Sequence, residues 1–138
     1  MRKYNVILLL NPECTHILMC LRQRPPYLGK YNLVGGKLEP GEGFLAAAYR
    51  ELREETAVTE ADVTLRPLMT FLYHRQDIEL QAYTGRLRHE VTLAEEVHPL
   101  TWMSIEENFY DMERFAGEGN IGHMLAQLRM DWDALTAP

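Results

Sequence analysis

The sequence predicts a mixed α/β domain in which helices pack on a small mixed β-sheet. Apolar runs of strand length lie near the start of the chain, and longer apolar runs lie at residues 64–88. A segment rich in Ala, Leu and Glu, typical of a helix, lies between them. The chain shows no repeat, no low-complexity tract and no Ser/Gly linker, so one domain over residues 1–138 is the economical expectation.

The individual elements follow from hydrophobic periodicity and turn residues. Gln76 and Asp77 form a candidate turn between two strands, and residues 35–43 are too rich in Gly and Pro for regular structure. Ser104 is a good N-cap with Glu107 at the capping-box spacing, which predicts a helix start. Strands are expected at Tyr4–Leu10, Ile17–Gln23, Tyr31–Val34, 64–75, 78–88 and Val97–Met103, and helices at Phe44–Thr56 and Ile121–Leu135.

Composition narrows the function classes. The chain has 14 Lys and Arg against 20 Asp and Glu, a net charge of −6. Nucleic-acid polymers and membrane surfaces both attract basic proteins, so neither is an expected partner. Two cysteines do not make a disulfide framework or a zinc site, which favours a reduced, cytoplasmic protein. The apolar run at 6–10 is shorter than a signal-peptide core, and no run approaches the roughly 20 residues of a membrane span.

Three glutamates form the most informative pattern. Glu51, Glu54 and Glu55 are spaced i, i+3, i+4, which places them on one helical face opposite Leu52. Clustered carboxylate oxygens are the ligands that Mg²⁺ prefers. The alternative is a solvated helix face, because Arg50 stands four residues before Glu54 at salt-bridge spacing. The Gly-rich loop before the helix favours the metal interpretation, since bare backbone lets phosphates or metals approach closely.

The spacing of these residues carries a family resemblance. Gly36 is followed after five residues by Glu42, and after seven more by the run RELREETAV at Arg50–Val58. This resembles the Nudix box, Gx5Ex7REUxEExGU with U apolar, at every fixed position except Ala57, where the family usually has glycine. A left-handed alanine there would carry about 1 kcal/mol of strain, and a different cap geometry is the alternative. The resemblance implies a Nudix-type α/β/α sandwich with a small mixed β-sheet.

The resemblance also implies a mechanism, in which water attacks a bridging diphosphate with the help of Mg²⁺ or Mn²⁺. Glu51 and Glu55 would be the principal metal ligands, Glu54 a further ligand or base, and the Gly36 carbonyl another ligand. Arg50 would orient the glutamates, with Glu42 supporting them. A general base in this family often lies outside the box, and Glu96 in the pair Glu95-Glu96 is the best-placed candidate, with a solvated loop as the alternative. Arg22 and Arg24 would meet phosphate or form a solvated face.

The segment Tyr31–Lys37 is similar to the Trp-Asn-x-x-Gly-Gly-Lys segment of 8-oxo-dGTP diphosphatases. The resemblance implies that Tyr31, Asn32 and Lys37 contact substrate, with the Asn32 amide binding the purine. Asn32 fits a turn equally well. Phe71 and Tyr73, with Tyr83, would line a base pocket, although alternating aromatic residues in strands are more often core.

The expected function is therefore metal-dependent cleavage of a nucleoside triphosphate, such as 8-oxo-dGTP or another purine dNTP, to monophosphate and pyrophosphate. The expected partner is this small-molecule nucleotide, bound by a monomer or a homodimer. One alternative within the family is another nucleoside diphosphate-X substrate, such as ADP-ribose or a nucleotide sugar. A second alternative is a catalytically silent Nudix module that senses a ligand.

Overall fold

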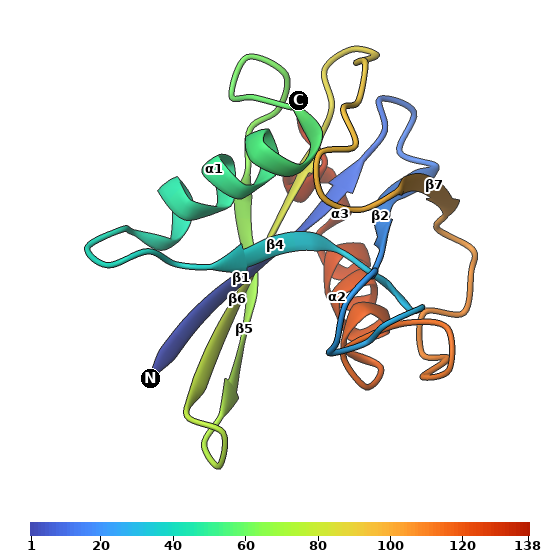
Figure 1. The fold of residues 1–138 in the computed structure, drawn as a ribbon. Coiled ribbons are helices and arrows are strands. Elements are labelled where there is room, and N and C mark those ends of the chain that lie inside the picture. The colour runs from blue at the N-terminus through green and yellow to red at the C-terminus, as the bar shows by residue number, and fades with distance from the viewer.

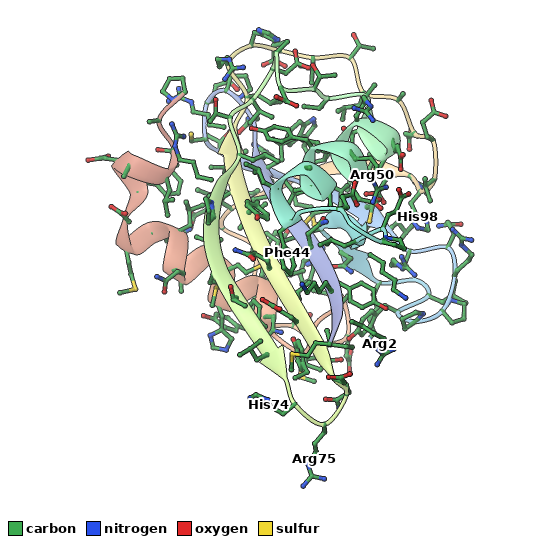
Figure 2. All side chains as sticks on the ribbon, turned by 90° about the vertical axis from the view of Figure 1, so that its left-hand side faces the viewer. Arg2, Phe44, Arg50, His74, Arg75 and His98 are labelled. Carbon is green, nitrogen blue, oxygen red and sulfur yellow. The ribbon has the colours of Figure 1, made fainter.

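The structure is a computed structural model that describes all 138 residues. It contains a seven-stranded sheet with helices on both faces. Figure 2 shows the helix Phe44–Thr56 on one side of the strands and the C-terminal helices on the other. The main path of the sheet runs β3-β2-β1-β6-β5, while β4 pairs with β1 and β7 pairs with β2. The β1–β6 pair is parallel and the other pairs are antiparallel, so the expected mixed sheet and flanking helices are confirmed.

Most expected elements are present with shifted ends. The hairpin around Gln76 and Asp77 forms as expected, with Asp77 at φ +55. The last strand begins three residues late, because His98 and Pro99 belong to the preceding loop and proline cannot donate to a ladder. The strands are β1 (Arg2–Leu10), β2 (His16–Leu21), β3 (Tyr31–Asn32), β4 (Val34–Lys37), β5 (Arg66–Tyr73), β6 (Ile78–Arg86) and β7 (Leu100–Ser104), and the helices are α1 (Phe44–Thr56), α2 (Asn120–Met130) and α3 (Trp132–Leu135).

The side chains of β1 alternate between two cores. Ile7 and Leu9 pack under α1, whereas Leu8 and Leu10 pack under α2 on the opposite face. All four are fully buried. A strand covered on both faces reads as a continuous apolar run, which explains the sequence of residues 6–10. β1 therefore lies in the middle of the layered fold (Figure 1).

The glycine pair after β3 is regular structure, contrary to the sequence expectation. Gly35 and Gly36 belong to β4 and pair with Val6 and Asn5 of β1. Gly35 has φ +149, and a Cβ there would lie 2.2 Å from the Asn5 carbonyl oxygen. The strand thus forms because both residues lack side chains, a local approach that composition alone does not reveal.

The predicted helix start at Ser104 is wrong. Ser104 still pairs with His16 in the β-ladder, and its Oγ accepts a hydrogen bond from the Glu106 N–H. Glu107 binds Arg114 instead of reaching back to Ser104, so the capping box does not form. Turns follow in place of a helix.

The predicted C-terminal helix is two helices. Asp131, with φ −138 and ψ 46, separates α2 from α3. The break lets Trp132 and Leu135 turn back onto the α2-side core. None of the three helices is long and apolar enough to cross a membrane.

Candidate active site

The helix α1 follows a loop that closes on β4. Its buried face, formed by Ala47, Ala48 and Leu52, packs on the sheet and fixes the rotation of the helix. The helix ends at Ala57 in the left-handed conformation (φ 70, ψ 5), whose N–H donates to the Arg53 carbonyl. The strained alanine cap anticipated from the sequence is therefore present, and it leaves the glutamate face intact.

Arg50 connects the loop to the glutamates of α1. Its Nε and second guanidinium nitrogen donate to the two carboxylate oxygens of Glu42 at 2.7 and 2.9 Å. Its remaining nitrogen donates to Glu51 at 3.0 Å and to Glu54 at 3.1 Å. Hydrogen bonding to Arg50 lowers the Glu42 pKa to about 2. Because the Arg50 side chain is only 15% exposed, this cluster differs from an ordinary solvated salt bridge.

The carboxyl group of Glu51 lies directly over Gly36. A Cβ at Gly36 would come within 2.7 Å of the Glu51 carboxyl carbon and of its Oε1. Any side chain at position 36 would therefore displace this carboxylate. Burial raises the pKa of Glu51 against the opposing attraction of Arg50.

Glu55 is the most strongly perturbed carboxyl group of the helix. Its Oε2 accepts a hydrogen bond from the Gly35 N–H at 2.9 Å. Burial nevertheless raises its pKa from 4.5 to about 7, since the Gly35 hydrogen bond and the charge of Arg22 offset only part of the desolvation. Desolvation therefore outweighs the nearby positive charge of Arg22, and a carboxyl group perturbed in this way is typical of functional sites.

The residues fit a divalent metal ion. The glutamates Glu51, Glu54 and Glu55 occupy one helix face, and Gly36 leaves its backbone open to the Glu51 carboxylate. The three carboxylates do not converge on one point in this structure. Arg50 donates hydrogen bonds to Glu51 and Glu54, and the Gly35 N–H donates to Glu55. Hard oxygen donors of this kind suit Mg²⁺ or Mn²⁺.

The loop before β7 borders the end of α1. The Ala94 N–H donates to the Thr56 carbonyl, which ties this loop to the helix. Glu95 is fixed by a hydrogen bond from the Leu100 N–H at 2.8 Å, whereas Glu96 is exposed. Glu96 thus remains the more available of the two carboxylates.

His98 anchors the same loop to the end of β2. It is only 4% exposed, and its Nδ1 accepts a hydrogen bond from the Gln23 N–H at 3.3 Å. Burial, followed by the charges of Arg22 and Arg24, lowers its pKa. Figure 2 shows His98 on the same side of the sheet as Arg50. Arg24 is exposed and lies near His98, while the charge of Arg22 also reaches Glu55.

The strand β3 directs its two side chains differently. Tyr31 packs on the α2-side core and stacks at a tilt on Phe115, with ring centroids 6.4 Å apart. Asn32 pairs with Cys20 of β2, and its Oδ1 accepts a hydrogen bond from the Leu33 N–H at 2.8 Å. The Asn32 oxygen therefore shapes the local turn, and its Nδ2 makes no hydrogen bond within the protein. Lys37 is exposed at the end of β4.

The aromatic residues of β5 lie on the α2 side of the sheet. Phe71 packs on the α2-side core, and the Tyr73 hydroxyl hydrogen-bonds the Asn120 amide of α2. Tyr83 belongs to the α1-side core and is 3% exposed, so it cannot join Phe71 and Tyr73. The alternation of strand side chains explains this separation.

Comparison with known families decides the identity of this arrangement. The NUDIX domain family matches residues 1–127. The chain belongs to the Nudix family. It is accordingly a hydrolase that acts on pyrophosphate bonds, and Glu42, Arg50 and the three glutamates of α1 occupy the positions that resemble the Nudix box.

Solved structures share the Nudix fold at low sequence identity. An Ap4A hydrolase from C. elegans superposes with a TM-score of 0.75 at 16% identity over 97% of this chain and 99% of its own. The NUDIX domain of Shewanella oneidensis NrtR, complexed with ADP ribose, gives 0.72 at 18% identity over 94% and 87%. A MutT/nudix family protein from Enterococcus faecalis gives 0.64 at 20% identity over 77% of this chain and only 44% of that one.

From the sequence, Arg22 was named only as a phosphate contact or a solvated residue, and His98 was not identified as part of this site. Arg22 acts on Glu55, yet strand alternation left it indistinguishable from a solvated residue. His98 is buried only because the loop before β7 folds against the end of β2. No local sequence pattern predicts the contact between His98 and Gln23, because these residues are far apart in the chain.

Proposed function

We propose that this Nudix hydrolase cleaves a nucleoside triphosphate, specifically a purine deoxynucleotide such as 8-oxo-dGTP, to monophosphate and pyrophosphate. The observation that carries the chemistry is the complete set of box carboxylates organised around Arg50 and Gly36. A domain that only senses a ligand has no need of these clustered, mutually repelling carboxylates. Their retention therefore supports catalysis.

In this proposal Glu51, Glu54, Glu55 and the Gly36 carbonyl hold Mg²⁺ or Mn²⁺. The bound metal would neutralise phosphate charge and lower the pKa of a coordinated water. Arg50 keeps the glutamates oriented through its hydrogen bonds to Glu51 and Glu54.

Glu96 serves as the general base in this proposal, because it is exposed on a loop tied to the end of α1. Arg24 and Lys37 bind phosphate oxygens, since both are exposed cations without an ion-pair partner at the margin of the site. In this proposal the metal ligands, the base and these cations contribute to one reaction site.

The base is recognised by residues of β3 and β5. The free Nδ2 of Asn32 donates to a purine acceptor, and the ring of Tyr31 lies one residue away. Phe71 and Tyr73 offer aromatic surface on the α2 side, where Tyr73 is already oriented by Asn120. The preference for a purine rests on this combination of aromatic surface and an unused amide donor.

A nucleotide panel tests the proposal. Purified protein with Mg²⁺ is assayed on dGTP, 8-oxo-dGTP, dCTP, ADP-ribose and Ap4A, and pyrophosphate release is measured separately from phosphate release. We expect the highest kcat/KM on a purine triphosphate, with pyrophosphate as product. Chelation should abolish turnover, and Mg²⁺ or Mn²⁺ should restore it. Preference for ADP-ribose or Ap4A would contradict the substrate, and full activity without metal would contradict the mechanism.

A further inference from the structure

A buried amide lies beneath α1 without any hydrogen-bond partner. Asn5 is 1% exposed, and neither its Nδ2 nor its Oδ1 is hydrogen-bonded. They are the only buried side-chain polar atoms of the structure in this state. A buried polar group without a partner destabilises a fold, so its presence in the central strand of the sheet calls for a physical reason.

The side chain of Asn5 points toward α1. Its neighbours at i−2 and i+2 in β1 both contact that side, since Lys3 lies over the Phe44 ring at 5.6 Å and Ile7 belongs to the α1-side core. Side chains two residues apart in a strand share a face. The amide of Asn5 is therefore enclosed between the sheet and the first turns of α1.

Asn5 is the direct neighbour of the position covered by Glu51. Asn5 pairs with Gly36 across the β1–β4 ladder, and paired Cβ positions lie about 4.5–5.5 Å apart. The Glu51 carboxyl group fills the place of the Gly36 Cβ, at 2.7 Å. Glu51 is thus the anionic acceptor beside Asn5 on this face.

The hydrogen bonds of Glu51 leave one oxygen for Asn5. Its Oε1 accepts a hydrogen bond from Arg50 at 3.0 Å, whereas Oε2 accepts none from the protein. An amide N–H next to an ionised carboxylate oxygen forms a charge-assisted hydrogen bond once side-chain torsions bring the two together. Such a bond would hold Glu51 from the sheet side, opposite to Arg50.

We propose that Asn5 is a positioning residue for the metal site, whose Nδ2 donates to Oε2 of Glu51 when that carboxylate binds the divalent cation. The inference rests on the proposed role of Glu51 as a metal ligand. In the metal-free protein the amide is a source of instability, and metal binding gives it a partner. Asn5 thereby links the central strand of the sheet to the carboxylates of α1.

The experiment compares Asn5→Leu with Thr84→Val in the full chain. Leucine has nearly the shape of asparagine but neither donates nor accepts. Thr84 is a fully buried polar residue of the same sheet whose hydroxyl donates to the Leu8 carbonyl at 2.9 Å, away from Glu51. Thermal unfolding of the metal-free proteins and Mg²⁺ titration by calorimetry, with Mn²⁺ binding followed by electron paramagnetic resonance, are measured on each.

We expect opposite shifts in the two readouts for Asn5→Leu. Its metal-free Tm should rise by roughly 3–8 °C, because an unpartnered polar group is removed. Its Mg²⁺ and Mn²⁺ Kd should increase roughly 10- to 100-fold, as for loss of a group that orients a metal ligand. Thr84→Val should lower Tm and leave both Kd values unchanged. Wild-type metal affinity in Asn5→Leu, at any Tm, overturns the inference.

A second pair guards against disturbed packing. Asn5→Thr and Asn5→Val differ only in a hydroxyl donor, so any change in packing is common to both. The valine protein should bind Mg²⁺ at least about threefold more weakly than the threonine protein, and equal affinities overturn the inference. If wild-type protein binds neither cation, the proposed function fails as well. If the wild-type protein binds the cations and the Asn5 variants bind them equally well, only the proposed role of Asn5 is refuted.

Discussion

Replacing Glu55 by glutamine should stabilise the metal-free protein at pH 8 while removing its activity. Burial raises the pKa of Glu55 from 4.5 to about 7. Each pKa unit corresponds to about 1.4 kcal/mol, so ionising this group in the folded protein opposes folding by roughly 3 kcal/mol. Glutamine keeps the shape and can still accept the hydrogen bond from the Gly35 N–H, but it carries no charge.

The pH dependence of this difference follows from the sign of the shift. Below pH 4.5 the carboxyl group is protonated in both folded and unfolded chains, so it costs nothing. Between pH 4.5 and about 7 the unfolded chain ionises first, and stability falls as the pH rises. Above pH 7 the loss is complete. The advantage of Glu55→Gln should therefore grow from nearly zero at pH 4 to roughly 3 kcal/mol at pH 8.

Thermal unfolding in buffer with chelator measures this effect. For a domain of 138 residues, 3 kcal/mol corresponds to a Tm difference of roughly 10 °C. Glu54→Gln is the matched control, because the Glu54 side chain is 52% exposed and its neutralisation should change Tm little at either pH. In the activity assay, Glu55→Gln should lose on the order of 10²-fold or more in kcat. Equal Tm values for wild type and Glu55→Gln at pH 8 would refute the reasoning.

Three further substitutions test other parts of the site. Arg50→Lys keeps the positive charge but loses the two parallel hydrogen bonds to Glu42, so kcat/KM should fall roughly 10- to 100-fold. Wild-type kinetics in this variant would show that Arg50 forms only a surface salt bridge. Asn32→Ala should raise KM for the preferred purine and lower kcat/KM roughly 5- to 150-fold; an unchanged preference among dGTP, 8-oxo-dGTP and dCTP would remove Asn32 from base recognition. Ala57→Gly should raise Tm by about 3 °C, because Ala57 is left-handed, whereas Ala46→Gly, at an exposed position in the first turn of α1, should lower it. Two shifts of the same sign in a thermal melt would contradict the strain at Ala57.

Local patterns predicted the helix α1 well. The residues of α1 begin and end where the sequence placed them, at Phe44 and Thr56. The spacing of its glutamates depends only on helix geometry, so no tertiary information was needed. The left-handed conformation of Ala57 was one of two cap geometries that its position in the motif left open.

Features that depend on tertiary contacts were predicted poorly. Gly35 and Gly36 form a strand only because β1 approaches them closely, and composition read them as loop. Ser104 carries a helix-start signal, yet its pairing with His16 keeps it in the sheet. The burial of Asn5 was missed for the same reason, since a polar residue within an otherwise apolar strand becomes unusual only once both faces are covered.

The glycines of β4 also permit the observed alignment of β1 in the sheet. Residues 6–10 are apolar on both sides, so sliding this strand by one residue would exchange the two cores without exposing a charge. Burial of apolar side chains therefore barely distinguishes the correct alignment of β1 from alignments shifted by one residue. Gly35 permits the correct alignment, because only a residue without Cβ tolerates the Asn5 carbonyl at this distance. A side chain at position 35 should favour misaligned, aggregation-prone chains during folding, and the harm would arise before any nucleotide is bound.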